Sequence, residues 1–462
     1  MTEIDRQRPD ANVAGLRVLV VWPPQVLSYF NAGHHTALYA VAGHLRKQPY
    51  VINVRVADWS VQATTWKEVA DVLYQGSFDL IAVMNDFDGV DGLPRFLRYA
   101  HELAPSARLL TFGRLSGIKP ELFRQFELDG IVAAGDYEAG VQAFAEIVAT
   151  AAWTRLPGVH VRGPNGDWLR PAGPGSTLPP EQWALPDVAE IPYAAYDRLY
   201  ADDQNKFCGI PVRRELVIPV ARGCPIGCEF CEVHVVFGRP DRRLSVEAVL
   251  DYIDRSAHAA QAEYVSFYAP TFTLDRRWVL EFCDRIQAEA YPLPWKCATT
   301  VHHLDEELVQ RMGAAGCVRI SVGVETLDPA GSQALPRAKR KSYEDVEQLN
   351  SWCAQAGIEL NCFVIVGLPG TSIAGAEATI AELRSLGART RPTMYCPTEQ
   401  LEEGMSTLEI AQYNRQIIVH DLPVADTRRS AYGLLFAREP KPTTVFTRIP
   451  ARHTDASHPV AQ

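Results

Sequence analysis

Arg222-Gly-Cys-Pro-Ile-Gly-Cys-Glu-Phe-Cys-Glu232 is the stretch of this 462-residue chain that decides its fold and its chemistry. It places Cys224, Cys228 and Cys231 on one short segment that glycine and proline interrupt. The apolar run of residues 216–220 leads directly into it, so we expect the thiols on a loop at the carboxyl end of a β-strand. Sheet-based enzymes keep their reacting groups at that edge. The stretch therefore predicts a metal or cluster site.

The number and spacing of the cysteines in this loop indicate which kind of metal site it forms. Three closely spaced thiolates can hold three irons of a [4Fe-4S] cluster, whereas a cluster tied wholly to protein takes four cysteines, so one iron stays open. A zinc site is the alternative, with His234 as the fourth ligand. A disulfide framework is disfavoured, because the ten cysteines are spread along the chain, three of them form an odd cluster, and no signal peptide is visible. We therefore expect a reducing, cytoplasmic location.

The CxxxCxxC spacing, with Phe230 before the last cysteine, resembles the radical S-adenosylmethionine (radical SAM) superfamily. The resemblance implies that Cys224, Cys228 and Cys231 bind a [4Fe-4S] cluster and that Phe230 lies at the cofactor site. It also implies that the open iron binds the amino and carboxylate groups of SAM. An external electron donor of the flavodoxin or ferredoxin type then drives the cleavage of SAM to a 5′-deoxyadenosyl radical.

Residues 215–390 repeat strand and helix patterns and predict the partial (β/α)6 barrel of that superfamily. We expect strands at residues 216–220, 264–268, 296–300, 319–324 and 362–366. The segment from Ser321 to Glu325 resembles the fourth-strand segment whose carboxylate contacts the ribose of SAM. The Gly367-Leu-Pro369-Gly stretch resembles a sixth-strand turn beside the adenine. Arg340 lies in the basic run 337–341. In one radical SAM subclass, described in the next paragraph, basic residues at this position reach the SAM carboxylate.

Residues 16–150 alternate short apolar strands with helices and predict a doubly wound parallel sheet, Rossmann-like in kind. The order of these elements resembles the cobalamin-binding domain of one radical SAM subclass. Three departures lead us to expect that cobalamin is absent: there is no Asp-x-His-x-x-Gly sequence, Gly113-Arg114 stands where two glycines are common, and Asn85 stands where small hydroxyl residues are common. His34 and His35 are interpreted as helix-start residues rather than as metal ligands.

The remaining segments connect or follow these two domains. We expect residues 1–15 to be disordered and the Pro-, Gly- and Trp-rich residues 151–214 to form a linker. Residues 391–462 are expected to close the open end of the barrel and to end in a disordered tail. Tyr395 and Glu399 are the candidate catalytic acid and base within this segment.

The charge balance limits the partners. The chain has 45 Lys and Arg against 55 Asp and Glu, a net charge of −10, which argues against nucleic-acid binding through phosphates. No apolar run approaches the length that spans a bilayer. The acidic surface is interpreted first as a solubility feature, and it would also suit a cationic substrate.

For the reaction, the chain resembles the radical SAM diol dehydratases of apramycin-type aminoglycoside biosynthesis. This resemblance implies abstraction of the C4′ hydrogen of a paromamine-like aminoglycoside, loss of the C3′ hydroxyl as water, and a 4′-keto product for an NADPH-dependent reductase. The alternative is a cobalamin-dependent radical SAM methyltransferase in natural-product biosynthesis. A third hypothesis is an iron–sulfur sensor or electron carrier without substrate chemistry.

Overall fold

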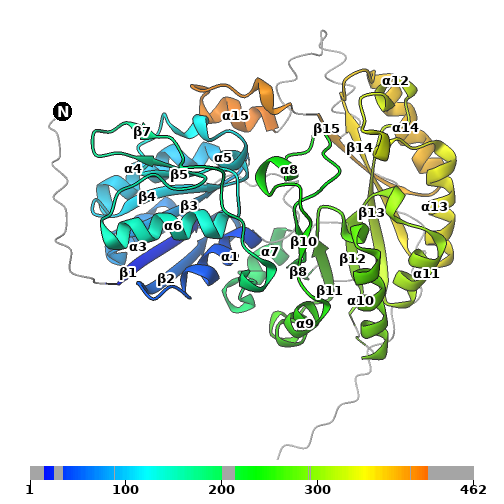
Figure 1. Cartoon of the computed structure of the whole chain (residues 1–462), viewed down its shortest axis with the longest axis horizontal. Helices are drawn as coiled ribbons and strands as arrows, with labels where there is room; N and C mark the ends of the chain where they lie inside the picture. The colour runs from blue at the N-terminus through cyan, green and yellow to red at the C-terminus, as the bar shows by residue number, and fades with distance from the viewer. Residues whose placement is uncertain are drawn as a thin grey trace, which may run out of the picture.

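The computed structural model describes residues 15–24, 35–87, 89–199, 214–289, 291, 293–395 and 397–414. Two separate sheets, each with its own helices, make up the protein, as Figure 1 shows. The front sheet is blue to cyan in that figure, and the second sheet is green to orange. The α/β fold class predicted from the sequence is confirmed, as a parallel-sheet Rossmann-like domain followed by a radical SAM barrel.

The front sheet has the strand order β2-β1-β3-β4-β5-β6-β7, in which the first five strands are parallel and the last two antiparallel. Alternate residues of β1 point to opposite faces of the sheet, with Val18 and Val20 in one apolar core and Leu19 and Val21 in the other. The strands are β1 (Leu16–Trp22), β2 (Val51–Asp58), β3 (Leu80–Asn85), β4 (Arg108–Gly113), β5 (Gly130–Val132), β6 (Val159–Arg162) and β7 (Trp168–Leu169).

Helices cover both faces of the front sheet, as a doubly wound fold requires. Helices α1 (Thr36–Leu45) and α6 (Tyr137–Thr150) pack together on one face. Helices α3 (Trp66–Gly76) and α4 (Leu93–Leu103) pack together on the other. The short helices α2 (Trp59–Gln62) and α5 (Arg114–Ile118) follow β2 and β4 directly.

The second sheet has six parallel strands that lie in chain order, from β8 at one edge to β15 at the other. The strands are β8 (Glu215–Pro219), β11 (Tyr264–Tyr268), β12 (Trp295–Thr299), β13 (Cys317–Glu325), β14 (Glu359–Val366) and β15 (Arg389–Met394). The helices are α9 (Val246–Ala260), α10 (Arg276–Ala288), α11 (Glu306–Ala314), α13 (Tyr343–Gln355) and α14 (Ile373–Ser385). The Gly367–Gly370 turn follows the fifth of these strands, so its assignment to a sixth strand is wrong.

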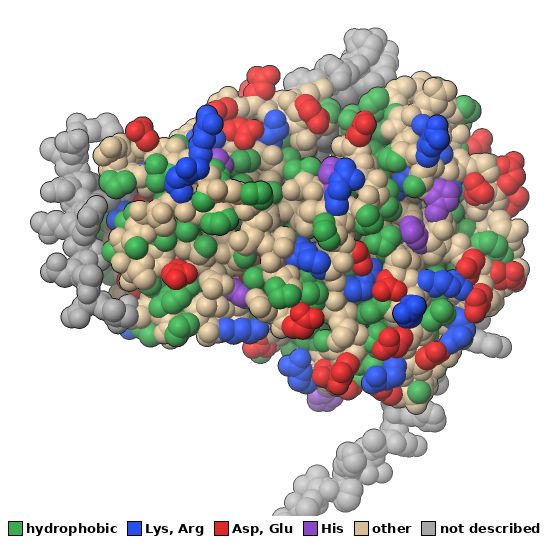
Figure 2. Space-filling model, viewed as in Figure 1, with side chains coloured by type: hydrophobic (Ala, Val, Ile, Leu, Met, Phe, Trp, Pro, Cys, Tyr) green, Lys and Arg blue, Asp and Glu red, His purple; other side chains and the backbone are tan. Residues whose placement is uncertain are grey.

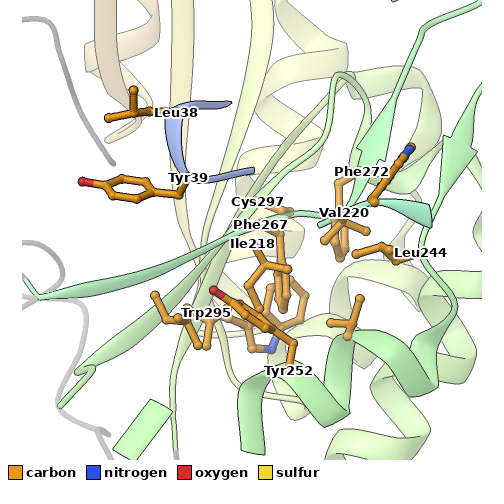
Figure 3. Packing of buried hydrophobic residues seen from close by; sticks show 14 of the residues in the cluster. Leu38, Tyr39, Ile218, Val220, Leu244, Tyr252, Phe267, Phe272, Trp295 and Cys297 are labelled. Carbon is orange, nitrogen blue, oxygen red and sulfur yellow. The ribbon is translucent and has the colours of Figure 1, made fainter. Parts of the chain in front are cut away.

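Aromatic packing holds the barrel sheet to its helices. The rings of Phe267, Phe282 and Trp295 meet edge to face, with centroids 5.1 to 5.6 Å apart. Phe267, Trp295 and Cys297 lie together beneath the strands in Figure 3. This core fixes the positions of the strands whose carboxyl ends carry the site described below.

Two segments connect the domains: the predicted linker between them and the chain after β15. The predicted linker adds β6 and β7 to the front sheet and contributes α7 (Tyr193–Leu199). After β15 the chain crosses to the front domain, where Leu401 and Ile410 are buried in the core cluster on the α3 and α4 face. Figure 1 shows α15 (Thr407–Asn414) lying over that domain.

None of the described helices is both long and apolar enough to cross a membrane. On the face shown in Figure 2, basic and acidic side chains are interspersed. The predictions for residues 1–14 and 415–462 lie outside the described residues.

Candidate active site

The three predicted thiols lie on a hairpin loop that leaves the barrel sheet after β8. Strands β9 (Ala221–Arg222) and β10 (Arg242–Arg243) pair antiparallel at the base of this loop. Cys224 and Cys228 are buried, Cys231 is partly exposed, and all three are free thiols. The loop therefore presents its thiols together at the carboxyl end of the first barrel strand.

Glycine is required where this loop begins. Gly223 has a φ of +83°, and a Cβ there would lie 2.0 Å from the carbonyl oxygen of Pro240. Only glycine adopts this backbone conformation and allows this approach without strain. The glycine that interrupts the motif thus lets the two ends of the loop meet.

The thiols need a cationic partner to lose their protons. Burial raises the pKa of Cys228 to about 11 and also raises the pKa of Cys231. A bound metal removes this cost, because the ligands are deprotonated on binding. In a [4Fe-4S] cluster each thiolate binds a different iron, so the thiolates stand further apart than the ligands of one zinc ion. Among the described residues no group of three or more His, Cys, Asp or Glu is arranged to hold a metal ion. The assignment of a cluster rather than zinc therefore rests on the CxxxCxxC spacing of the three cysteines.

Glu325 ends β13 in a conformation that side chains rarely adopt. Its φ is +66°, and a β-bulge between Gly323 and Glu325 interrupts the pairing with β14. The other described non-glycine residues with positive φ are Ala63, Ser77, Ala151 and Gln261, which all end helices. Left-handed residues outside such caps concentrate at functional sites, because the surrounding structure has to hold them there.

Lys339 is the basic residue that the fold brings to this carboxylate. Its Nζ lies 2.8 Å from Oε1 of Glu325, and both side chains are almost fully buried. Burial alone would lower the pKa of Lys339, but the carboxylate of Glu325 and the thiols of the cluster loop outweigh it and raise that pKa. The Lys339 ammonium also lies 5.9 Å from the centroid of the Phe230 ring. A fixed positive charge thus stands between Glu325 and the thiols.

Gly323 makes room for this ion pair. A Cβ at that position would lie 2.2 Å from Oε1 of Glu325 and 2.6 Å from Nζ of Lys339. Both groups pack over the bare backbone of β13, so any side chain at Gly323 would displace them.

Arg340, the basic residue predicted at this site, makes other contacts. Its guanidinium donates to the carbonyl oxygens of Leu335 (3.0 Å) and Gln333 (3.0 Å), which stabilises the loop after α12 (Pro329–Ser332). Its contact to the SAM carboxylate stays a prediction. Lys339, in the short helix η8 (Arg337–Lys339), is the residue of the same basic run that contacts Glu325.

The other predicted SAM-contact residues lie on the neighbouring strands. Ser321 is buried in β13 and accepts a hydrogen bond from Nδ2 of Asn361 on β14 at 3.1 Å. Gly367 and Gly370 both have a φ of +83°, and Pro369 between them is exposed. The turn after β14 thus has the backbone freedom that was predicted for it, and its contact to the adenine stays a prediction.

Tyr395 and Phe230 lie together, whereas Glu399 lies at the surface. Both aromatic side chains pack against a small apolar cluster formed by Leu335, Ile365 and Leu368. Burial raises the pKa of Tyr395, and the carboxylate of Glu399 raises it further. Glu399 is exposed, in the short helix η9 (Thr398–Gln400). Their roles as acid and base stay predictions.

A second polar pair at this edge escaped the sequence analysis. Lys341 is 9% exposed, and its Nζ meets Nδ1 of His302, which follows β12. Burial lowers the pKa of Lys341 to about 8, and the nearby charge of Lys339 lowers it as well. The two residues are separated by 38 positions in the chain and share no motif, so only the barrel brings them together.

At the carboxyl edge of the front sheet, the side chains at the ends of β3 and β4 are bonded to one another. Nδ2 of Asn85 donates to Oγ1 of Thr111 (2.8 Å) and to Oγ of Ser116 (2.9 Å), and the backbone N–H of Ser116 donates to Oδ1 of Asn85 (2.9 Å). Asn85 thus fills the place of a small hydroxyl residue and closes a buried network.

Arg114 reaches across from this edge to the cluster loop. Its Nε and Nη2 donate to the carboxylate of Glu232 at 2.5 and 2.9 Å, and Nη1 lies 3.5 Å from Asp86. The Arg114 side chain is 46% exposed, so this contact is a surface ion pair and contributes only about 0–1 kcal/mol. Gly113, at the end of β4, has a φ of +143°, and a Cβ there would lie 2.0 Å from the backbone oxygen of Asn85. Because its ion pair with Glu232 is exposed, Arg114 can turn away from this edge at little cost.

A second buried network joins side chains at the carboxyl ends of β1 and β2. Nδ1 of His35 lies 3.0 Å from both oxygens of Asp58, and the hydroxyls of Tyr39 (3.2 Å) and Tyr196 (2.7 Å) donate to Asp58. The His35 ring stacks on Trp22 with centroids 3.6 Å apart. His35 is thus a paired helix-start residue, as interpreted from the sequence, and His34 lies outside the described residues.

Comparisons with known proteins agree with this two-domain arrangement. Residues 218–383 match the radical SAM superfamily. The chain is 23% identical over 378 residues to an uncharacterized methyltransferase, PH0819, of Pyrococcus horikoshii, covering 80% of this chain and 78% of that protein. It is 28% identical over 430 residues to the anaerobic magnesium-protoporphyrin IX monomethyl ester cyclase of Rubrivivax gelatinosus, covering 88% and 71%.

Among solved structures, the radical SAM methyltransferase TsrM of Kitasatospora setae, with cobalamin and a [4Fe-4S] cluster bound, superposes with a TM-score of 0.68. The match covers 91% of each chain at 17% identity. The cobalamin-dependent SAM radical enzyme OxsB superposes with a TM-score of 0.63, covering 90% of this chain and 56% of OxsB at 16% identity. These likenesses show that the fold is shared.

Two sequence-based expectations do not survive these comparisons. The diol dehydratase acting on an aminoglycoside is contradicted, because the relatives and structural neighbours include methyltransferases and give no support to a dehydratase. The expected absence of cobalamin is in doubt, because a structural neighbour over the whole frame carries it. The predicted reductase follows only from the keto product, and no finding concerns it.

The residues and the comparisons point to the same chemistry. Three thiols, a strained Glu325 and a glycine turn lie at the carboxyl ends of β8, β13 and β14, inside the segment that matches the superfamily. Residues 218–383 therefore form a domain of the radical SAM superfamily, and this match supports an enzyme of that superfamily that uses a [4Fe-4S] cluster and SAM.

Proposed function

We propose that this chain is a cobalamin-dependent radical SAM methyltransferase. The observation that carries the proposal is that both domains share their fold with TsrM. The superposition covers 91% of each chain, so it includes the front domain. A relative that spans 80% of this chain also bears the name of a methyltransferase. Both matches extend well beyond the barrel, which alone would indicate only radical generation.

The residues of the chain have separable tasks in this proposal. Cys224, Cys228 and Cys231 hold the cluster, and Glu325 accepts hydrogen bonds from the ribose hydroxyls of SAM. Lys339 holds the Glu325 side chain in place through the contact of 2.8 Å between its Nζ and Oε1 of Glu325. The apolar cluster around Phe230 and Tyr395 excludes water from the radical.

The front domain supplies the place for the second cofactor. The backbone at Gly113 and the ends of β3 and β4 would hold cobalamin, opposite the thiol loop. When bound, the cluster supplies the electron that cleaves SAM, and cobalamin supplies a carrier for its methyl group. We further propose an external electron donor of the flavodoxin or ferredoxin type.

The test measures the two products that SAM can give, S-adenosylhomocysteine and 5′-deoxyadenosine. Anaerobically reconstituted protein is incubated with SAM labelled in its methyl group, a reductant and paromamine, with and without hydroxocobalamin, and the products are identified by mass spectrometry. We expect S-adenosylhomocysteine only when cobalamin is present, together with 5′-deoxyadenosine in amounts that depend on Cys228. Absence of S-adenosylhomocysteine in both arms, with paromamine converted to a product lighter by one water, would overturn the proposal.

A further inference from the structure

The base of the thiol loop is held by the front domain through buried ion pairs. In the antiparallel pairing of β9 and β10, Arg222 stands directly opposite Arg242. Like charges at directly opposed positions of a β-ladder destabilise it. The two guanidinium groups therefore need anions, and the carboxylates that pair with them in the described part of the chain belong to the front domain.

The anions come from the start of helix α6 in the front domain. Nη1 and Nη2 of Arg222 donate to Glu138 at 3.0 and 2.6 Å, and Nη1 and Nη2 of Arg242 donate to Asp136 at 2.6 and 3.0 Å. Nη1 of Arg222 also lies 3.4 Å from Asp136. Both contacts are bidentate, which fixes orientation as well as distance. The two carboxylates lie where the amino end of a helix favours negative charge.

Burial makes this network rigid. The side chains of Asp136 and Glu138 are 0% and 3% exposed, and those of Arg222 and Arg242 are 11% and 15% exposed. The indole ring of Trp183, from the linker, lies 4.3 Å from the Arg222 guanidinium carbon. An ion pair so far removed from water cannot be broken on one side without leaving an uncompensated buried charge.

The returning half of the loop is attached to the same place. The backbone N–H of Gly135 donates to the carbonyl oxygen of Val236 at 2.7 Å, and Nη2 of Arg242 donates to the carbonyl oxygen of Phe237 at 3.2 Å. The backbone N–H of Cys224 donates to the carbonyl oxygen of Gly238 at 3.2 Å. The first cysteine, the end of the loop and the start of α6 are thus joined by consecutive contacts.

We propose that Glu138 and Asp136 are positioning residues of the iron–sulfur site: through Arg222 and Arg242 they fix the thiol loop in the geometry that holds the cluster. The front domain then has a task in radical generation that does not depend on cobalamin. This inference goes beyond methyl transfer, and it holds whichever group the radical finally modifies.

The test uses the reconstituted full-length protein and measures the cluster rather than turnover. In Glu138→Gln, the isosteric amide keeps the shape but removes the charge that compensates Arg222. Outer-shell partners of metal ligands typically change metal affinity by about 10–100-fold, so we expect cluster loading to need about tenfold more iron and sulfide. We also expect the electron paramagnetic resonance signal of the reduced cluster, and its change on adding SAM, to differ from those of the wild type.

Two further variants make the result specific. Glu190→Gln is the matched control, because Glu190 also pairs with an arginine, Arg46, but lies in the linker away from the thiol loop. This variant should have the iron content and the electron paramagnetic resonance signal of the wild type. Glu138→Asp keeps the charge and should recover most of the iron content and the wild-type signal.

The decisive comparison is between folded proteins. If Glu138→Gln folds, as judged by circular dichroism, and shows wild-type iron content and wild-type spectra with and without SAM, the proposal is wrong. If it does not fold, Arg222→Lys decides, because it keeps the charge and loses the bidentate contact. Wild-type loading and spectra in Arg222→Lys would then overturn the proposal, and a perturbed cluster would support it.

Discussion

The carboxyl edges of the two sheets differ in how their side chains are paired. At the front edge, side chains are bonded to their neighbours: Asn85 to Thr111 and Ser116, and Asp58 to His35 and two tyrosines. At the barrel edge, groups that are costly to hold lie together: thiols with raised pKa values, Glu325 with a positive φ, and Lys341, whose pKa is lowered by burial. The difference locates the chemistry on the barrel and gives the front domain a holding role.

The largest effect is expected at the barrel edge, with Cys228→Ala. Loss of one of three cluster ligands should abolish 5′-deoxyadenosine formation, by at least about a thousandfold, because the reaction has no other electron path. The measurement is chromatographic assay of 5′-deoxyadenosine after anaerobic incubation with SAM and a reductant. Cys283→Ala, at a buried free thiol in α10, is the control and should keep its activity. Retained activity in Cys228→Ala would contradict the assignment of the cluster.

The next largest effect is expected at the front edge, and it should be one of stability. Asp58→Ala removes the carboxylate that His35, Tyr39, Tyr196 and Ser60 contact, so four buried side chains each lose a hydrogen bond. We expect a loss of about 3 kcal/mol in the free energy of unfolding, measured by denaturant titration. Iron content and SAM cleavage at low temperature should change little. A folded variant that no longer cleaves SAM would show that the front edge takes part in the chemistry.

The third prediction compares two carboxylates at opposite ends of the same strand pair. Glu325→Gln should weaken SAM binding about tenfold, because the amide loses the charge-assisted hydrogen bonds to two hydroxyl groups. Glu359→Gln is the matched control: Glu359 pairs with Arg319 where β13 and β14 begin, far from the thiols. Equilibrium binding of SAM to the reconstituted proteins measures both. Equal affinities in the two variants would remove Glu325 from the SAM site.

The sequence predicted the elements of the barrel and its thiol loop because these features are local. The cysteine spacing, the glycines and the apolar strands each lie within a few residues, and the predicted strands coincide with β8, β11, β12, β13 and β14. Ser245 accepts a hydrogen bond from the N–H of Ala248, as expected of a helix N-cap. The fold class followed from the same alternation of strands and helices.

What the sequence did not predict depends on pairs that are distant in the chain. Arg222 and Glu138 are 84 residues apart, and His302 and Lys341 are 39 apart. Glu325 and Lys339 are 14 residues apart, and their contact was not predicted either. The reaction was predicted wrongly because Asn85 and Arg114 were taken to exclude a corrin, although an exposed arginine can move at little cost.

The smallest effect concerns that arginine and tests how firmly the front edge is closed. In Arg114→Ala the ion pair with Glu232 no longer has to open before a corrin approaches Gly113. A surface pair contributes about 0–1 kcal/mol, so cobalamin should bind up to about fivefold more tightly, as measured by titration of its visible absorption. Arg46→Ala, which removes an ion pair elsewhere in the front domain, is the control and should leave this affinity unchanged. Weaker binding in Arg114→Ala would mean that the guanidinium holds the corrin instead of blocking it, and the front edge would then be a binding surface in its own right.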